Sequence, residues 1–433
     1  MSPVKVKLIQ ESEKYQLFVD GQPFYINGAG LEWGSIKSLA EYGGNAFRTW
    51  RVDNGAKTAL EILNEAQQHG LMVCMGLEVA RERHGFDYDD VAAVAQQKAQ
   101  IKQDILALKD HPALLMWGIG NELNLRHKNP KVWDAVNDLA IMIHDIDPNH
   151  PTSTMLAGAE PEVIKRVVER CPDVDLLSFQ LYGEIDQLPR FLSESGYQGA
   201  YIVSEWGATG HWECQCTDWG RPIEANSSDK ANDYKDRYLK YIAADDQQCI
   251  GSFVFLWGQK QERTPTWYGV ILENGKNTAS AQVMQYLWTG QWPEHRAPTV
   301  SGLTINGLSA EDSVRLTEQS IYQAEVTVEN TRDQALSYRW EIMAEVDKSV
   351  ESDGGDFEPT PDIIWCDATD NSSAKVDFTA PTAGEYRLFV YIDDVYGSAA
   401  TANMPILVES LAKKRSVLHR IKKYLSFFFN RPH

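Results

Sequence analysis

Two glutamates stand where a pair of carboxyl groups could carry out proton transfer and nucleophilic attack. Glu122 closes the apolar run Trp117–Glu122 (WGIGNE), and Glu205 closes the run Ile202–Glu205 (IVSE). A protonated carboxyl group can donate a proton to a leaving oxygen, and an ionised one can attack an electron-poor carbon. A single glutamate at the end of a strand more often caps a helix or forms a salt bridge. The pair therefore acquires a chemical meaning only if the fold brings both side chains together.

Short apolar runs alternate with amphipathic helical patterns from about residue 20 to residue 293. Most of these runs lack strict alternation of apolar and polar residues, which is typical of parallel strands buried on both faces. Eight strands are expected, at Phe24–Glu32, Asn45–Trp50, Leu71–Leu77, Ala113–Asn121, Thr152–Leu156, Val174–Leu181, Ala200–Trp206 and Ile250–Trp257. Their number and spacing predict an α/β fold of the (β/α)₈ TIM-barrel type.

Helical patterns separate the strands, and the clearest are Ala56–His69, Val132–Ile146, Tyr234–Ala243 and Ala279–Trp288. A doubly wound open sheet is the structural alternative, and it would usually carry a glycine-rich phosphate loop after an early strand. The segment Gly28–Gly30 is followed by Leu-Glu-Trp, so that loop motif is missing from the sequence. The barrel is therefore favoured.

In a TIM barrel the working residues lie at the carboxyl ends of the strands. Glu122 would follow the fourth strand and Glu205 the seventh, so both would face the barrel mouth from opposite sides. Two carboxyl groups placed in this way can flank one glycosidic bond. A separation of about 5 Å suits attack by one of them with retention of configuration, whereas a wider gap admits water and gives inversion. We predict a glycosidase with Glu122 as acid/base and Glu205 as nucleophile, a covalent glycosyl-enzyme intermediate and no cofactor.

Other strand ends carry residues that would support this chemistry. Arg48 could hold the nucleophile ionised, Tyr182 could donate a hydrogen bond to it, Asn121 could bind a sugar hydroxyl, and Trp257 could offer a stacking surface. Further candidates for substrate contact lie at strand ends or in the loops that follow: Glu32, Trp33, Trp50, Glu78, Gln180, Trp206, Trp212, Trp219 and Trp267. A tryptophan near a barrel rim is often a packing residue, which is the alternative for each of these.

Six segments carry a resemblance to a known family: Phe18–Gly30 (FVDGQPFYINGAG), Asn45–Arg48 (NAFR), Trp117–Glu122 (WGIGNE), Asp175–Tyr182 (DLLSFQLY), Ile202–Gly207 (IVSEWG) and Phe253–Trp257 (FVFLW). The region Phe18–Trp292 resembles the clan A glycoside hydrolases. It is most similar to the catalytic barrel of glycoside hydrolase family 2, with some likeness to family 5. The resemblance implies Glu122 as acid/base, Glu205 as nucleophile and Asn121 as the ligand of a sugar 2-hydroxyl.

The sequence also departs from that family. Family 2 enzymes usually carry two β-domains before the barrel, and almost nothing precedes it here. Gln180 stands where those enzymes often have Asn, and Glu32-Trp33 replaces a His-containing stretch. These differences concern the sugar specificity more than the carboxylate pair.

Composition narrows the range of partners. A formal net charge of −20 argues against nucleic acid or another polyanion. Thirteen tryptophans either fill cores or stack on sugars. Cys214 and Cys216 form a lone C-x-C pair, which by itself does not make a metal site, so none is expected.

We expect a β-linked glucan or oligosaccharide as substrate. Water as acceptor would make the protein a hydrolase, a second sugar would make it a transglycosylase, and a silent glycan-binding protein is the alternative of another class.

The sequence pattern changes near Trp292–Pro298, where prolines and charged residues interrupt the alternation of apolar runs and helical patterns. Alternating strands are then expected at Tyr322–Val328, Ser337–Met343, Lys375–Phe378 and Tyr386–Ile392. They predict a small antiparallel β-sandwich, similar to PKD or immunoglobulin-like modules, which act as spacers more often than as sugar binders. The predicted organisation is a catalytic barrel at 1–296, a β-sandwich at 297–409 and a basic tail at 410–433.

The basic tail at 410–433 is relevant to the cellular location of the protein. Leu411–Phe428 places apolar residues at helical spacing among lysines and arginines. Such a basic amphipathic helix can lie on an anionic membrane surface, and the alternative is a helix packed on the barrel or the sandwich. No signal peptide begins the sequence. A cytoplasmic protein, at the inner membrane surface if the tail binds lipid, is therefore expected, or an extracytoplasmic one if a leader precedes this sequence. The oligomeric state stays open.

Overall fold

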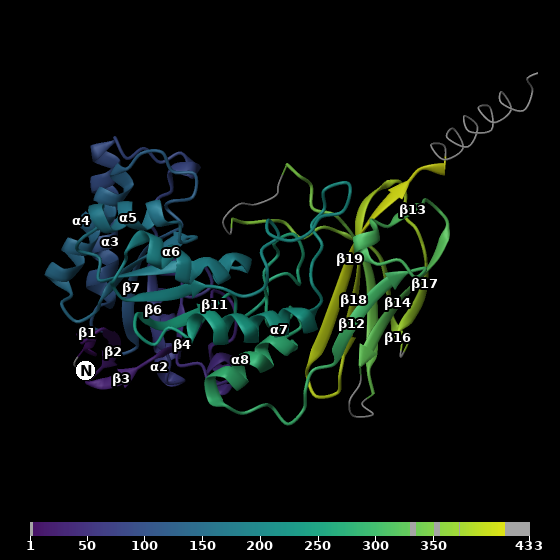
Figure 1. Cartoon of the computed structure of the whole chain (residues 1–433), viewed down its shortest axis with the longest axis horizontal. Coiled ribbons are helices and arrows are strands. Elements are labelled where there is room, and N and C mark those ends of the chain that lie inside the picture. Colours follow the sequence, from purple (N-terminus) through teal and green to yellow (C-terminus); the bar gives the residue numbers. More distant parts are fainter. Residues whose placement is uncertain (1–2, 330–334, 350–355, 372, 412–433) are drawn as a thin grey trace, which may run out of the picture.

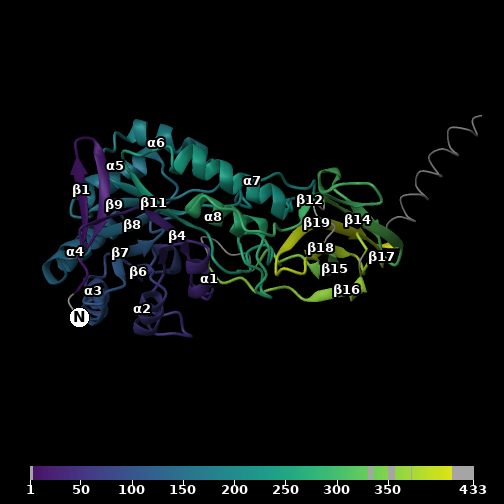
Figure 2. The ribbon, with the colours of Figure 1, turned by 90° about the horizontal axis from the view of Figure 1, so that it is seen from below.

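The computed structural model describes residues 3–329, 335–349, 356–371 and 373–411. These residues form a barrel and a β-sandwich that lie end to end along the long axis of the molecule (Figures 1 and 2). Within these ranges, no helix combines the length and the apolar character that crossing a bilayer requires. The expected helix of the basic tail lies outside the described residues, apart from Leu411.

The barrel is a closed ring of eight parallel strands in the order β10-β11-β4-β5-β6-β7-β8-β9. The strands are β4 (Ile26–Gly30), β5 (Ala46–Arg48), β6 (Met72–Leu77), β7 (Leu114–Asn121), β8 (Thr152–Ala157), β9 (Leu176–Gln180), β10 (Tyr201–Glu205) and β11 (Cys249–Val254). Each overlaps one of the eight expected runs, so the TIM-barrel prediction is confirmed. The runs that extend past their strands, such as Asn45–Trp50 and Ile250–Trp257, continue into rim loops.

Helices alternate with these strands and cover the outside of the barrel (Figure 1). They are α1 (Ile36–Glu41), α2 (Ala59–Gln68), α3 (Val91–Leu108), α4 (Lys131–Ile146), α5 (Pro161–Arg170), α6 (Leu188–Ser195), α7 (Ser227–Arg237) and α8 (Ala279–Thr289). The helix expected at Tyr234–Ala243 starts earlier, because Asn226 caps α7 by accepting from the backbone N–H groups of Ser228 and Asp229. It ends in a π-helical turn, Tyr238–Ile242.

A small antiparallel sheet closes the end of the barrel opposite the mouth. It consists of β1 (Val6–Glu11), β2 (Lys14–Val19) and β3 (Gln22–Phe24). Val6 and Leu17 of this sheet are buried in one apolar cluster with Ile26 and Leu115 from the beginnings of the barrel strands. The strand expected at Phe24–Glu32 corresponds to β4, and only its first residue, Phe24, belongs to β3. With one end of the barrel filled, the opposite mouth is the open one.

The second domain is the predicted β-sandwich. One sheet contains β12 (Thr299–Ile305), β14 (Ile321–Glu329) and β17 (Lys375–Thr379). The other contains β13 (Arg315–Thr317), β19 (Ala399–Glu409), β18 (Gly384–Asp393), β15 (Ser337–Ala344) and β16 (Ile363–Asn371). All pairs are antiparallel except β13 with β19. Apolar residues from the inward faces of both sheets fill one core.

Buried polar contacts join the sandwich to the barrel. Lys230 on α7 pairs with Glu224, and both are buried. Asn403 on β19 donates from Nδ2 to Glu224 Oε2 over 2.7 Å, and Arg387 on β18 donates to the carbonyl of Pro222 over 2.9 Å. Buried ionic groups need geometrically defined partners, so these contacts specify one orientation of the two domains.

Candidate active site

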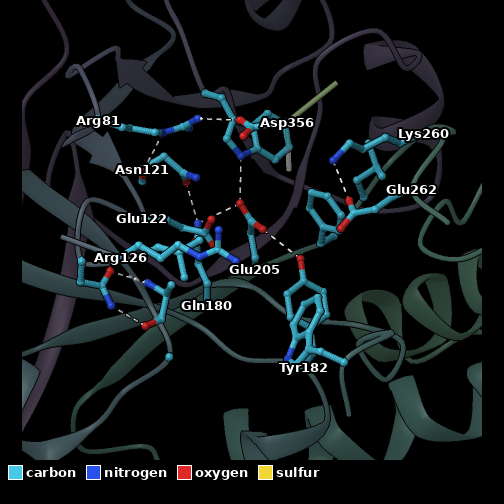
Figure 3. Close-up of a pocket in the computed structure, with 18 of the residues that line it drawn as sticks. Arg81, Asn121, Glu122, Arg126, Gln180, Tyr182, Glu205, Lys260, Glu262 and Asp356 are labelled. Atoms are coloured by element: carbon cyan, nitrogen blue, oxygen red, sulfur yellow. Dashed lines mark hydrogen bonds and ion pairs between the residues drawn. The ribbon is translucent and has the colours of Figure 1, made fainter. Parts of the chain in front are cut away.

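A cavity of about 680 Å³ lies at the carboxyl ends of the barrel strands (Figure 3). Asn121 ends β7, Gln180 ends β9 and Glu205 ends β10, and all three line this cavity. Glu122 and Tyr182, which follow β7 and β9, line it as well. The two glutamates predicted to act together thus share one cavity at the barrel mouth.

Glu205 is a buried carboxylate held by four side-chain donors. Its Oε1 accepts hydrogen bonds from Arg48 Nη1 at 3.0 Å, Trp50 Nε1 at 2.9 Å and Gln180 Nε2 at 2.8 Å. Its Oε2 accepts one from the Tyr182 hydroxyl at 2.9 Å. One cationic and three neutral donors stabilise the negative charge and fix the plane of the carboxylate. Since Oε1 takes three of these bonds, Oε2 is the oxygen with capacity left for an incoming carbon.

The amide of Asn121 is oriented by its neighbours. Its Oδ1 accepts from Arg48 Nη2 and from Gln180 Nε2, both at 2.7 Å. Arginine has only donors, so the oxygen of Asn121 must face it and the NH₂ group must point away. This group remains available to donate a hydrogen bond to a ligand in the cavity.

Glu122 has the opposite surroundings. It lies one residue after β7 with a positive φ of 51°, and its backbone N–H donates to the Met155 carbonyl over 2.9 Å. Its buried Oε2 accepts no hydrogen bond from any described residue, and the guanidinium of Arg83 is 4.0 Å away. Burial and the negative charge of Glu205 raise the pKa of Glu122 to about 7, against the opposing effect of Arg83. A carboxyl group with such a pKa can donate a proton near neutral pH.

Most of the expected site residues surround this pair. Those that line the cavity are Glu32, Trp33, Trp50, Glu78, Asn121, Glu122, Gln180, Tyr182, Glu205 and Trp212. Arg48 does not line the cavity; it is buried and donates hydrogen bonds to Glu205 and Asn121. Trp33 and Trp212 are more than half exposed and keep ring faces open to the solvent.

Trp257 does not meet the expectation of a stacking surface. It is fully buried and packs against Tyr42 and Trp288, with ring centroids 5.3 and 5.9 Å away. Phe255 lines the cavity in its place and contacts the ring of Trp50 at 5.8 Å. β11 ends at Val254, so the alternation of side chains along the strand no longer determines where these residues point.

Three further tryptophans were expected to face substrate and do not line the cavity. Trp206 is fully buried against Tyr234 and Tyr238. Trp267 is buried and donates its indole N–H to the Thr209 carbonyl over 2.9 Å. Trp219 lies beside Arg315 of the sandwich. These rings are packing residues, which was the alternative.

The structure adds a third buried carboxylate that the sequence did not suggest. Glu262 lines the cavity, with Lys260 Nζ 2.7 Å from Oε2 and His211 Nε2 3.6 Å from Oε1 (Figure 3). Burial would raise the pKa of Glu262, but the contacts with His211 and Lys260 outweigh it and lower this pKa to about 2. Glu262 lies in an irregular rim loop, where no periodic pattern marks a functional residue.

The cavity carries an excess of acidic groups. Among the described residues, nine carboxyl side chains line it, against four from Arg and Lys. The carboxyl groups belong to Glu32, Glu78, Glu122, Glu160, Glu184, Glu205, Glu213, Glu262 and Asp356. An acidic cavity disfavours anionic ligands and suits uncharged ones that offer many hydroxyl groups.

Comparisons with known proteins place this molecule among distant structures only. No family model and no curated protein matches the sequence. A β-glucuronidase from Parabacteroides merdae has 12% identity and a TM-score of 0.47, over 94% of this chain and 51% of that one. A β-mannanase from the blue mussel Mytilus edulis has 12% identity and a TM-score of 0.42, over 66% of this chain and 96% of that one.

A β-1,3-glucanosyltransferase from Rhizomucor miehei has 14% identity and a TM-score of 0.41, over 58% of this chain and 95% of that one. This chain spans about half the length of the P. merdae protein, 51% of it. The structural neighbours named here are thus glycoside hydrolases and a transglycosylase, while the barrel itself is established by the strand pairing described above.

Proposed function

We propose that this protein is a retaining β-glycoside hydrolase that acts on a β-linked glucan or oligosaccharide of uncharged sugars. One observation carries the proposal: a carboxylate fixed by four donors shares a cavity with a buried carboxyl group whose pKa is raised to about 7. Nucleophile and general acid need these two environments. The excess of carboxyl groups around the pair supports an uncharged sugar over a uronic acid.

In the first step, Glu205 Oε2 attacks the anomeric carbon and forms an ester with it. The bond from that carbon to the glycosidic oxygen breaks, and the protonated Glu122 gives its proton to the departing oxygen. Arg48, Trp50 and Gln180 hold Oε1, so the attacking oxygen keeps its position. The NH₂ group of Asn121 is placed to donate to a hydroxyl of the reacting sugar.

In the second step, Glu122 takes a proton from water, the water oxygen bonds to the anomeric carbon, and the ester to Glu205 breaks. Ester formation neutralises Glu205, whose negative charge is one cause of the raised pKa of Glu122. The pKa of Glu122 then falls, which suits its change of role from acid to base.

Transglycosylation is a second candidate, and the exposed rings at the rim favour it. Trp33 is 62% exposed and Trp212 is 59% exposed, and both line the cavity. Such rings can hold an acceptor sugar in place of water, and a bound acceptor reacts as if it were highly concentrated. Oligosaccharides longer than the substrate would then form.

The test is incubation of the protein with aryl β-glycosides and with β-1,3-, β-1,4-linked glucans and mannans, followed by mass and anomer analysis. Shorter products with a retained β-anomer would support the hydrolase, and longer products would support the transglycosylase. Inverted products would contradict a retaining mechanism. Glycan binding without any turnover would indicate a glycan-binding protein.

A further inference from the structure

One wall of the cavity comes from the β-sandwich and not from the barrel. Asp356 and Phe357 line the cavity, although they lie in the connection between β15 and β16 of the sandwich. In Figure 1 the light-green segment that follows residue 356 extends from the sandwich towards the barrel. We propose that the segment Asp356–Glu358 completes a sugar-binding subsite, with Phe357 as its stacking ring. The inference rests on the proposed function in so far as its ligand is the glycan of that cavity.

Glu358 fixes one end of this segment to the barrel. It is buried at 2% exposure, and its Oε1 accepts from Gln261 Nε2 at 3.2 Å and from the backbone N–H of Arg263 at 2.6 Å. Its Oε2 accepts from Arg263 Nη1 at 2.8 Å. Hydrogen bonds from charged and neutral donors to a buried carboxylate have defined directions. They hold this end of the segment at the rim loop that follows β11.

Asp356 fixes the other end. Its Oδ2 lies 2.9 Å from His84 Nε2, and its Oδ1 accepts from Arg81 Nη1 at 3.4 Å. Arg81 also donates from Nε to the Asn121 carbonyl over 3.2 Å, which places this contact directly beside the catalytic strand end (Figure 3). Since β4 and β5 separate β11 from β6 in the barrel order, the segment bridges two rim loops that are not neighbours.

Phe357 lies between these two anchors, and its side chain is 88% exposed. A phenyl ring that lies so far outside any core contributes little packing energy. The backbone of Phe357 is nevertheless fixed on both sides, by Asp356 and Glu358. Most of the Phe357 surface is exposed, at the border of a cavity that also presents Trp33 and Trp212. The apolar C–H face of a sugar ring is a suitable partner for such an aromatic face.

The position also predicts what the subsite would recognise. Glu122 and Glu205 define the bond that is cleaved, and Phe357 borders the same cavity without taking part in the contacts that hold Glu205. A sugar stacked on Phe357 would be a different one from the sugar that reacts, so its binding would depend on the length of the glycan. A segment that merely braced the two domains would not discriminate by glycan length.

The experiment measures the affinity of Glu205→Gln protein for di- and hexasaccharides of the cello-, laminari- and manno-series by calorimetry. Phe357→Ala in this background is expected to weaken hexasaccharide binding about tenfold and disaccharide binding less. Ile321→Ala is the matched control, since Ile321 is 73% exposed on β14 and does not line the cavity. The melting temperature should not change in either variant, because neither side chain is packed in a core.

Hexasaccharide affinity that survives Phe357→Ala, or that falls equally in both variants, would overturn the inference. A lack of binding of every hexasaccharide to the Glu205→Gln protein would overturn it too. The proposed function is judged separately, by turnover of aryl β-glycosides by the unmodified protein. Length-dependent binding through Phe357 without such turnover would leave the subsite standing and remove the glycosidase.

Discussion

The surroundings of Glu205 and of Glu122 differ in almost every respect, although the two side chains are identical. Glu205 is the last residue of β10, and its carboxylate accepts four hydrogen bonds from the side chains around it. Glu122 lies just beyond β7 in a left-handed conformation, and its Oε2 has no hydrogen-bond donor among the described residues. Donors stabilise the ionised form of one group, and burial favours the neutral form of the other. The difference teaches how one fold can give two glutamates the distinct environments that the proposed nucleophile and acid would need.

Removal of the negative charge on Glu205 is expected to have the largest effect on turnover and would abolish the difference between the two glutamates. Glu205→Gln leaves an amide that cannot form the ester, and turnover of an aryl β-glycoside should fall by about four orders of magnitude or more. Steady-state rates measure the loss. Glu169→Gln on the exposed surface of α5 is the control, and it should behave as the unmodified protein does. Wild-type rates in Glu205→Gln would refute the role of Glu205.

Glu122→Gln should cost less, and the cost should depend on the leaving group. Loss of a general acid lowers rates by about 10²- to 10⁴-fold when the leaving oxygen needs a proton. A dinitrophenolate leaves without protonation, so the first step with that substrate should be nearly preserved. Pre-steady-state measurements with both kinds of leaving group would reveal the difference. Equal losses for good and poor leaving groups would contradict the assignment of Glu122 as the acid.

The raised pKa of Glu122 should also be visible in stability. Its pKa is about 7 in the folded protein against an ordinary value of 4.5, with burial as the main cause. The folded state therefore holds the proton more tightly than the unfolded chain, and stability is lost as pH rises from about 4.5 to about 7. The full loss corresponds to about 3 kcal/mol. Glu122→Gln cannot ionise, so it should exceed the unmodified protein in stability at about pH 8 and match it at about pH 4.

Urea unfolding of both proteins at the two pH values checks this expectation. If the difference in unfolding free energy between the variant and the unmodified protein were the same at both values, Glu122 would not titrate as described.

Substitution of Glu262 should have a smaller effect, a shift in the pKa of Glu122. Its negative charge is among the causes that raise the pKa of Glu122. Activity is expected to fall as pH rises through about 7, where Glu122 loses its proton. Glu262→Gln should move this alkaline limb to lower pH, because it removes one repulsive charge. A pH profile of kcat/KM measures the shift, and an unmoved or upward-shifted limb would contradict the coupling.

The barrel strands could be predicted because burial on both faces leaves a continuous apolar run. That pattern located all eight strands, and through them the ends where Glu122 and Glu205 lie. The β1–β3 sheet carried no comparable signal, since β1 and β2 each bury one residue and β3 buries none. Its presence became apparent only from its packing under the barrel.

The remaining site residues escaped prediction for a different reason. Glu262 and Asp356 lie in irregular connections, and they reach the cavity only through tertiary contacts that no local pattern encodes. Phe255 and Trp257 lie just past β11. The side chain of Phe255 lines the cavity, whereas that of Trp257, two residues further on, is buried in the core. The sequence therefore placed Glu122 and Glu205 at the barrel mouth, but it did not indicate the parts of the cavity lining that come from irregular connections.

The most direct measurement is covalent trapping of the intermediate with a 2-deoxy-2-fluoro β-glycoside that carries a dinitrophenyl leaving group. The fluorine slows both steps, and the activated leaving group restores the first, so the ester should accumulate. Mass spectrometry of the digested protein should then find one added glycosyl group on Glu205, and none in Glu205→Gln. A label on another residue, or turnover with inverted product and no label at all, would contradict the account.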